Sequence, residues 1–357
     1  MQNMNDYRID SHKLVFHPQR VAAWQSGEDI YPIYAEISPA GGCNHRCTFC
    51  ALDYMEYQPR FLESVTLLER LTEMGQLGVK SVMYGGEGEP LLHRDMGEIV
   101  RHTRESGIDV AITTNGVLLT KSLCEKILDC TSWIKISLNA GTPETYARIH
   151  RTAETDFAKV LANLESAVRL QRTIGSRCTL GAQLLLLPEN AGEVETLAIT
   201  LRDIGLDYLV IKPYSQHLHS RTSAYRDLDY TQFLSLRDRL TALDTATFKV
   251  IFREETMKKL AVKTRGYGQC HALPFWSYID AGGTVWGCSA HLGDDRFAYG
   301  NIHQQTFAQI WQGERRRENL KFVASLDPRE CRTNCRMDEV NRYLWELTHP
   351  GTHVNFI

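Results

Sequence analysis

The sequence predicts an α/β protein, a partial (β/α)6 TIM-like barrel followed by a small α+β domain at its C-terminal end. From about residue 31 to 213, short apolar runs alternate with amphipathic stretches, a pattern typical of β-α units around a parallel sheet. Six such units predict an open barrel, because a closed one has about eight. Beyond residue 265 the alternation stops and cysteines become frequent. The chain of 357 residues is long enough for two structural units.

Six apolar segments are the expected strands. In chain order they cover 33–39, 80–86, 109–114, 133–138, 179–187 and 208–213. The clearest helix is expected over 155–172, where Phe157, Leu161, Leu164 and Val168 form one apolar stripe at helical spacing. Functional side chains are expected at the carboxyl ends of these strands, where the loops of such sheets converge.

The remaining segments divide the chain further. We expect an N-terminal extension (1–30), the barrel (31–225), a helical linker (226–265) and the C-terminal domain (266–357). Helices near 229–243 and 254–262 form the linker. In the C-terminal domain, the segment "DAGG" at 280–283 predicts the turn of a β-hairpin.

Composition excludes several classes of protein. The formal net charge is −3, whereas a nucleic-acid-binding protein typically has an excess of basic residues. The sequence has no signal peptide and no apolar run near the roughly 18 residues of a membrane span, so we expect a cytoplasmic protein without a membrane partner. In that compartment ten cysteines are expected as reduced thiols that serve as ligands rather than as disulfides.

Three cysteines follow the first expected strand in the spacing C-x3-C-x2-C, at Cys43, Cys47 and Cys50. A structural zinc site takes four ligands, commonly as two C-x2-C pairs, and this segment offers three. Three thiolates on one short loop match a 4Fe-4S cluster with one iron left open for another ligand. The plainer alternative is that these three cysteines lie in the loop by chance and bind nothing.

This triad resembles the defining motif of the radical S-adenosylmethionine superfamily. In that family the open iron binds S-adenosylmethionine, which is cleaved by one electron to a 5′-deoxyadenosyl radical. The segment "YGGEGEPLLH" (84–93) resembles the family's GGE motif, which binds the ammonium group of the cofactor. Glu89 aligns best because Pro90 follows it, and Glu87 remains an alternative. A simple glycine-rich turn is the structural alternative for this stretch.

The resemblance implies further contacts with S-adenosylmethionine. "TTNGVLL" (113–119) and "SLNAGTPETY" (137–146) follow the third and fourth strands, at the barrel mouth. Phe49 resembles the aromatic residue beside the adenine, although it could equally be core, and Asn115 could equally serve a turn. The expected cofactor-binding residues are Phe49, Gly85, Gly86, Glu87, Glu89, Asn115, Ser137, Asn139 and Gln183.

A second set of cysteines lies near the C-terminus, at Cys270, Cys288, Cys331 and Cys335. On spacing alone, these four could bind zinc. Behind a barrel of this family, they resemble the twitch domain, a shortened relative of the SPASM domain that holds one auxiliary 4Fe-4S cluster. A full SPASM domain has more cysteines and two clusters. The layout resembles that of the dehydrogenases that act on 2-deoxy-scyllo-inosamine.

Four cysteine ligands would cap every iron of the auxiliary cluster, so its expected role is to accept an electron. The leading prediction is therefore net oxidation of a polar small molecule such as a sugar, an aminocyclitol or a nucleoside. Lys212 or Tyr214, at the end of the sixth strand, could accept the proton that the substrate loses. A flavodoxin or ferredoxin-type protein is the expected reductant.

Other reactions remain as alternatives. A radical epimerase needs a hydrogen donor near the substrate, but Cys124, Cys130 and Cys178 are expected on a helix or at the amino-terminal rim. Decarboxylation is a further alternative. A peptide-modifying maturase is disfavoured because the short segment before the first strand leaves no room for a leader-binding domain. A zinc-stabilised binding protein is the non-catalytic alternative.

Overall fold

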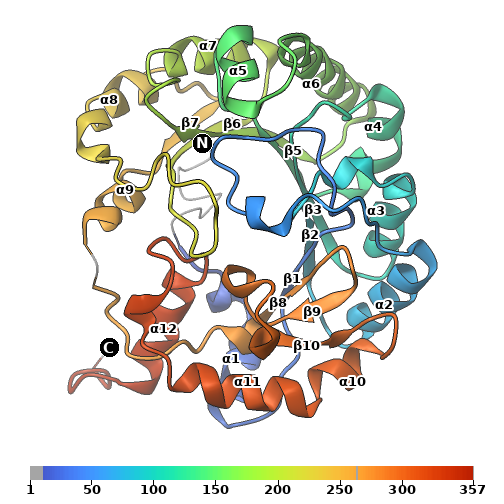
Figure 1. Ribbon diagram of the computed structural model, residues 1–357, viewed down its shortest axis with the longest axis vertical. Helices are drawn as coiled ribbons and strands as arrows, with labels where there is room; N and C mark the ends of the chain where they lie inside the picture. Colours follow the sequence, from blue (N-terminus) through green and yellow to red (C-terminus); the bar gives the residue numbers. More distant parts are fainter. Residues whose placement is uncertain (1–10, 263, 357) are drawn as a thin grey trace.

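The computed structural model describes residues 11–262 and 264–356 and shows one curved sheet covered by helices (Figure 1). Residues 1–10 of the expected N-terminal extension lie outside the described residues. Within the described part, the sheet has ten strands in the order β10-β9-β8-β1-β2-β3-β4-β5-β6-β7. The strands are β1 Tyr34–Ile37, β2 Ser81–Tyr84, β3 Asp109–Thr114, β4 Trp133–Ser137, β5 Thr179–Leu186, β6 Tyr208–Pro213, β7 Lys249–Phe252, β8 Trp276–Ile279, β9 Thr284–Trp286 and β10 Ala298–Asn301.

Strands β1 to β7 run parallel in sequence order, and helices cover their outer face (Figure 1). These helices are α2 Ser64–Gln76, α3 Met96–Glu105, α4 Lys121–Ile127, α5 Pro143–His150, α6 Thr155–Ile174, α7 Val194–Ile204, α8 Leu236–Thr241 and α9 Glu254–Ala261. The six predicted strands are all present, so the α/β barrel class is confirmed. The expected stripe of α6 is also present, with Phe157, Leu164 and Val168 buried and Leu161 half-buried.

Strand β7 is the parallel barrel strand that sequence analysis missed. It lies between the two helices expected in the linker 226–265, and it pairs in parallel with β6. Its four residues, KVIF, are too few to show a period of two. The neighbouring helices α8 and α9 are close to their expected positions.

Alternation along β4 shows how the barrel separates its two faces. Ile134 and Ile136 are fully buried in the core, whereas Trp133, Lys135 and Ser137 point to the opposite face and are half-buried. Gln183 on β5 and Lys212 on β6 continue this polar face. The inner face of the sheet is therefore polar where the strands end.

The C-terminal strands extend the sheet of the barrel. Strand β8 pairs in parallel with β1, with Tyr34 opposite Trp276 and Ile37 opposite Ile279. Strands β8 and β9 form the predicted hairpin, and Gly283 in its turn adopts φ +84°, a conformation that suits glycine. The two regions that contain cysteine sets are thus joined by backbone hydrogen bonds. Helices α10 Phe307–Trp311, α11 Glu314–Ala324 and α12 Asp338–Thr348 complete this region.

The N-terminal helix α1 Pro18–Gln25 packs on the C-terminal region. Leu14 and Val21 share a small apolar cluster with Phe275 and with Leu344 of α12. This packing ties the two ends of the described chain together. None of the helices in the described ranges combines the length and apolar character that crossing a membrane requires.

Candidate functional site

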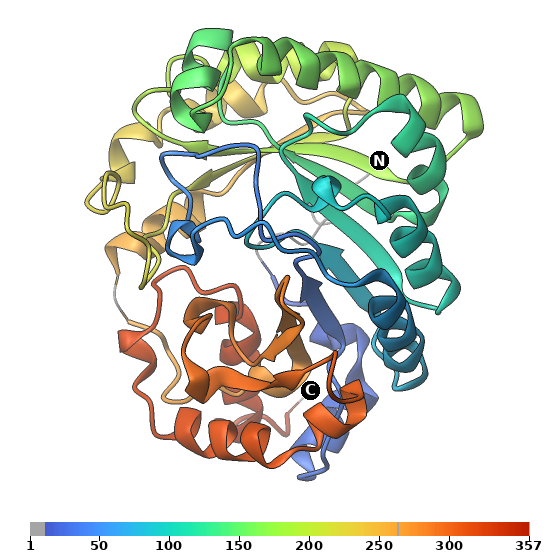
Figure 2. The same cartoon turned by 45° about the vertical axis from the view of Figure 1, so that its right-hand side comes forward.

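The loop that contains the first three cysteines is fixed to the end of α5. The backbone N–H of Arg46 donates to the carbonyl of His150 at 3.0 Å, and that of Thr48 donates to Ile149 at 2.9 Å. Figure 2 shows this loop, in blue, between the barrel and the orange C-terminal region. The segment after β6 covers it, since Ser220 and Thr222 donate to the carbonyls of Cys50 and Thr48 at 3.1 and 2.9 Å.

The three thiols of this loop fit an iron–sulfur cluster. Cys43, Cys47 and Cys50 are free and half-buried. Burial raises the pKa of the Cys43 thiol to about 11, and the charges of Cys43 and Cys50 raise the pKa of Cys47. Three thiols gathered in one loop suit the irons of a cluster, because a positively charged metal centre stabilises the thiolate form. The other cysteines of the described residues lie in the core or in the second set.

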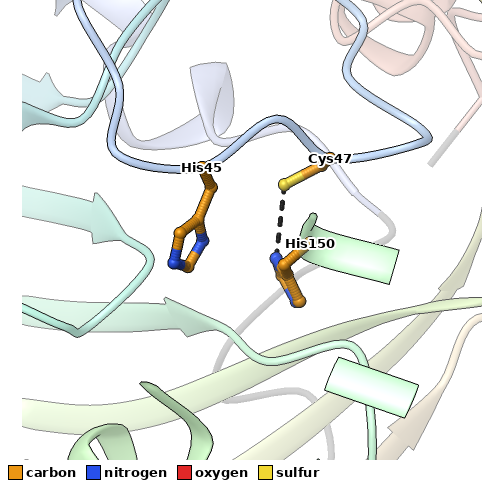
Figure 3. Close-up of side chains that lie close together, drawn as sticks. All are labelled: His45, Cys47 and His150. Atoms are coloured by element: carbon orange, nitrogen blue, oxygen red, sulfur yellow. Dashed lines mark hydrogen bonds between the residues drawn. The ribbon is translucent and has the colours of Figure 1, made fainter. Parts of the chain in front are cut away.

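Two histidines flank Cys47 (Figure 3). The Nδ1 atom of His150 lies 3.2 Å from the Sγ atom of Cys47, and one potential ligand atom from each of His45, Cys47 and His150 lies within 4.8 Å of the others. His45 lies 3.6 Å from the carboxylate of Asp156. Burial lowers the pKa of His150 far below its usual value. Sequence analysis missed His150 because it lies 103 residues beyond Cys47.

The glycine-rich segment after β2 lies directly against the cysteine loop. The N–H of Glu89 donates to the carbonyl of Gly42 at 2.9 Å. A Cβ atom at Gly88 would lie 2.2 Å from that same oxygen, so only glycine fits there. Gly86 adopts φ +106°, and a Cβ atom there would lie 2.5 Å from Ser38. Gly85 is the residue directly before Gly86 in the chain. The motif therefore shapes the backbone beside the three thiols.

Both acidic residues of this segment are buried and already have protein donors. Glu89 accepts hydrogen bonds from Thr114 Oγ1 at 2.6 Å and from the N–H of Asn115 at 2.8 Å, and burial raises its pKa to about 6. Glu87 accepts from Arg60 at 3.2 Å and from the N–H of Ala281 at 2.9 Å. The role of either carboxylate toward the ammonium group of the cofactor stays a prediction.

The other predicted cofactor contacts fall into two groups. Asn115 contacts the cysteine loop, because its Nδ2 donates to Asn44 Oδ1 at 2.6 Å, and Phe49 lies edge-on to His150 with ring centroids 5.7 Å apart. Asn139 is buried, and its Oδ1 accepts from the N–H of Leu185 at 2.7 Å. Ser137 and Gln183 lie deeper on the inner face. Their contacts with S-adenosylmethionine stay predictions.

A hydrogen-bonded row crosses the inner face from β6 to β4. Lys212 Nζ donates to Gln183 Oε1 at 2.8 Å, and Gln183 Nε2 donates to Ser137 Oγ at 2.8 Å. Burial lowers the pKa of Lys212 far below its usual value, and the positive charges of Lys135, Arg253 and Arg332 lower it further. Sequence analysis named Lys212 but missed the cations around it, which come from other strands and from the C-terminal region.

Tyr214 is buried, and its hydroxyl donates to Gln216 Oε1 at 3.2 Å. Burial raises its pKa, so it is a weaker candidate than Lys212 for accepting a proton at neutral pH. Glu189 accepts a hydrogen bond from the hydroxyl of Tyr225. Asn190 Oδ1 accepts from the N–H of Leu187, and Asn190 Nδ2 donates to the carbonyl of Asn139. Both residues therefore take part in hydrogen bonds that hold the loops, while Glu189 Oε2 is buried without a partner among the described residues.

The four C-terminal cysteines also come together, although 65 residues separate the first from the last. Cys270, Cys288, Cys331 and Cys335 are free and half-buried. Burial raises the pKa of each thiol, that of Cys270 to about 12, and the charge of Cys335 further raises the pKa values of the other three. Cys288 lies just after β9, the second strand of the hairpin, and Cys335 lies just before α12. Four clustered thiols fit an auxiliary cluster in which every iron has a cysteine ligand.

Two residues that sequence analysis missed hold this second set. The buried guanidinium of Arg265 donates to the carbonyls of Pro328, Cys331, Arg332 and Thr333 at 2.6–3.1 Å. Asn341 Nδ2 lies 3.4 Å from the Sγ atom of Cys270, and its Oδ1 accepts from the N–H groups of His271 and Ala272. Neither belongs to a local motif, so their roles became visible only in the fold.

The three remaining cysteines lie away from both sets. Cys124 of α4 and Cys178, which precedes β5, are buried in the core, and burial raises the pKa of each to about 12. Cys130 lies half-buried before β4. These positions match the expected helix and amino-terminal rim.

Comparisons with known proteins agree with this geometry. Residues 37–200 match the model of the radical SAM superfamily, and residues 270–336 match the SPASM iron–sulfur cluster-binding domain. The GTP 3',8-cyclase of Chlorobaculum tepidum is 30% identical over 54% of this chain and 57% of its own length. A probable GTP 3',8-cyclase of Saccharolobus solfataricus is 34% identical over 50% of this chain and 60% of its own length. The chain thus spans little more than half the length of these curated relatives.

Solved structures share the fold. SuiB of Streptococcus suis bound to S-adenosylmethionine aligns over 88% of this chain and 72% of its own, with a TM-score of 0.63 and 18% identity. The structure of anSMEcpe with bound AdoMet aligns over 87% of this chain and 88% of its own, with a TM-score of 0.58 and 18% identity. The barrel domain binds S-adenosylmethionine and a 4Fe-4S cluster, and the second domain indicates auxiliary iron–sulfur binding. The chain therefore contains a radical SAM domain, over residues 37–200, and a SPASM iron–sulfur cluster-binding domain, over residues 270–336.

Proposed function

We propose that this enzyme oxidises a polar small molecule, such as a sugar, an aminocyclitol or a nucleoside. When bound, S-adenosylmethionine and its cluster supply a 5′-deoxyadenosyl radical that removes one hydrogen atom, and the auxiliary cluster supplies the acceptor for a second electron. The protein then has to bind a polar substrate between the two cysteine sets and to accept one proton from it. In this proposal, the seven predicted cysteines are the cluster ligands, and the residues predicted to contact S-adenosylmethionine bind that cofactor.

The observation that carries this proposal is a group of buried polar atoms with no partner among the described residues. Among these atoms are Tyr54 Oη, Ser215 Oγ and Arg332 Nε. Tyr54 follows Cys50 in the first loop, Arg332 adjoins Cys331 in the second set, and Arg332 Nη2 donates to the carbonyl of Ser215 at 2.8 Å. A buried polar atom without a partner costs about 1–3 kcal/mol, which a polar ligand placed between the two sets can offset.

Lys212 is the proposed base. Burial strongly lowers the pKa of this amine, which favours its uncharged form, and the lone pair of that form can accept a proton from a hydroxyl or amine. The hydrogen bond to Gln183 orients the amine without occupying that lone pair. The raised pKa of Tyr214 makes that residue the weaker candidate.

The curated relatives help to rank the substrates. GTP 3',8-cyclases act, by their name, on a nucleotide, so nucleosides and nucleotides are the first compounds to test. The structural neighbours include complexes with peptides, but their likeness of 17–19% identity supports the fold rather than a substrate. We place the reaction in the cytoplasm, where a flavodoxin or ferredoxin-type protein would supply the electron.

The test is an anaerobic incubation of the reconstituted enzyme with S-adenosylmethionine, dithionite and deuterium-labelled nucleosides, sugars or aminocyclitols. We expect deuterium in 5′-deoxyadenosine and a product two mass units lighter than the unlabelled substrate. The Cys47→Ala variant is the control and should give neither. Transfer of deuterium only from a labelled peptide, or a product of unchanged mass, would contradict the proposed oxidation.

A further inference from the structure

His150 lies at the end of a chain of hydrogen bonds that leads from strand β5 to the first cysteine set. The N–H of Leu185 lies 2.7 Å from Asn139 Oδ1, the Nδ2 atom of Asn139 lies 3.4 Å from His150 Nε2, and His150 Nδ1 lies 3.2 Å from Cys47 Sγ. Figure 3 shows the last contact. The direction of each bond follows from chemistry alone.

A backbone N–H can only donate, so the atom of Asn139 that faces Leu185 must be the oxygen. The amide nitrogen of Asn139 therefore faces His150 and donates to Nε2. A ring nitrogen that accepts carries no hydrogen, so the hydrogen of the neutral imidazole is on Nδ1. The contact with Cys47 is consequently an N–H donor pointing at sulfur.

The position of the ring is fixed from both sides. Tyr146 packs on it with ring centroids 4.2 Å apart, and the carbonyl of His150 accepts the N–H of Arg46 in the cysteine loop. His150 is buried, with 1% of its surface exposed. The ring is therefore shielded from water, and the ring and the loop keep their relative positions.

We propose that His150 tunes the reduction potential of the first iron–sulfur cluster by donating a hydrogen bond from Nδ1 to the thiolate of Cys47. Hydrogen bonds to the sulfur ligands are among the factors that set the potential of such clusters. Reduction adds one negative charge, which an N–H donor stabilises, so the bond raises the potential. His150 is a positioning residue in this role, and Asn139 fixes its tautomer.

The test measures the midpoint potentials of both clusters in the reconstituted holoenzyme by EPR-monitored titration without S-adenosylmethionine. The signal of the first cluster is identified by its change when S-adenosylmethionine is added. His150→Phe keeps an aromatic ring and removes the donor, so we expect a more negative potential for the first cluster. His150→Asn places an amide N–H near the position of Nδ1 and should restore most of the original value.

Two controls separate the hydrogen bond from general damage. The potential of the auxiliary cluster should stay constant in every variant. His93 is also buried but bonds to the carbonyl of Leu62 at 2.8 Å, so His93→Phe should leave both potentials unchanged. An unchanged first potential in His150→Phe, or equal shifts in the Phe and Asn variants, would overturn the proposal.

A measurement on the wild-type protein does not depend on the folding of any variant. Pulsed EPR of the reduced first cluster, in protein whose histidines carry nitrogen-15 only at the ring atom Nδ1, should show coupling to the Nδ1 atom of His150; this label leaves out the backbone N–H of His45, which donates to Cys43 Sγ. That coupling should be absent from the His150→Asn variant. Absence of the coupling from the wild-type protein would overturn the proposal by itself.

Discussion

Lys212 Nζ lies 2.8 Å from Gln183 Oε1, and the nitrogen of the same amide donates to Ser137. Because Gln183 presents its oxygen to the lysine, the amine donates one hydrogen and keeps its remaining positions free. Lys212, Gln183 and Ser137 come from three adjacent strands, so the sheet register fixes the row. This geometry gives Lys212 a defined orientation in a polar interior.

The first prediction concerns the pH dependence of product formation. The pKa of Lys212 is lowered in the folded protein, so the uncharged amine persists to lower pH than in a free lysine and is lost as pH falls through that pKa. We expect product formation to decline on the acid side, and Lys212→Met to reduce it by about 10²–10⁴-fold. Initial rates across pH for both proteins provide the measurement. Persistence of the wild-type rate in Lys212→Met would exclude its role as the base.

The second prediction concerns the auxiliary set. In Cys288→Ala the second cluster loses a ligand, so the electron acceptor should be impaired while the first loop is untouched. We expect cleavage of S-adenosylmethionine to continue without product, seen as 5′-deoxyadenosine in the absence of oxidised substrate. Cys47→Ala is the comparison, because it should abolish the cleavage itself. Full product formation by Cys288→Ala would rule out the acceptor role.

A third prediction concerns the contact between the glycine-rich segment and the cysteine loop. A Cβ atom at Gly88 would lie 2.2 Å from the carbonyl oxygen of Gly42 and 2.3 Å from that of Ala40. Gly88→Ala should therefore displace the loop, lower the free energy of unfolding by about 1–3 kcal/mol and reduce the iron content. Gly192→Ala is a matched control, because a Cβ atom there meets nothing within 4 Å. Denaturant unfolding and iron analysis would compare the two, and equal behaviour would contradict the close contact.

The fourth prediction concerns Arg265, which is buried and donates to four carbonyls around Cys331. Arg265→Met should leave these carbonyls without donors and destabilise the second cysteine set by about 2 kcal/mol or more. Loss of iron from the auxiliary set during mild heating is the measurement. Arg296→Met serves as the control, because its ion pair with Asp294 is exposed. Equal iron retention in the two variants would remove the structural role of Arg265.

Local patterns in the sequence determined much of this protein. Strands β1 to β6, the helix α6 and the hairpin at Gly283 follow from periodicity and turn residues within short windows. The seven cysteines predicted as cluster ligands were identified from spacing and from resemblance to a family, and only the first three stand at short intervals on one loop. These features require no knowledge of distant contacts.

Tertiary structure alone decided how distant parts meet. The contact of His150 with Cys47, the hydrogen bonds from Arg265 to four carbonyls and the pairing of β8 with β1 join residues that are 63 or more positions apart. Strand β7 needed its neighbour β6 to define it, and the low pKa of Lys212 needed cations from other elements. Such contacts leave no periodic signal, because packing in three dimensions selects their partners after the local elements have formed.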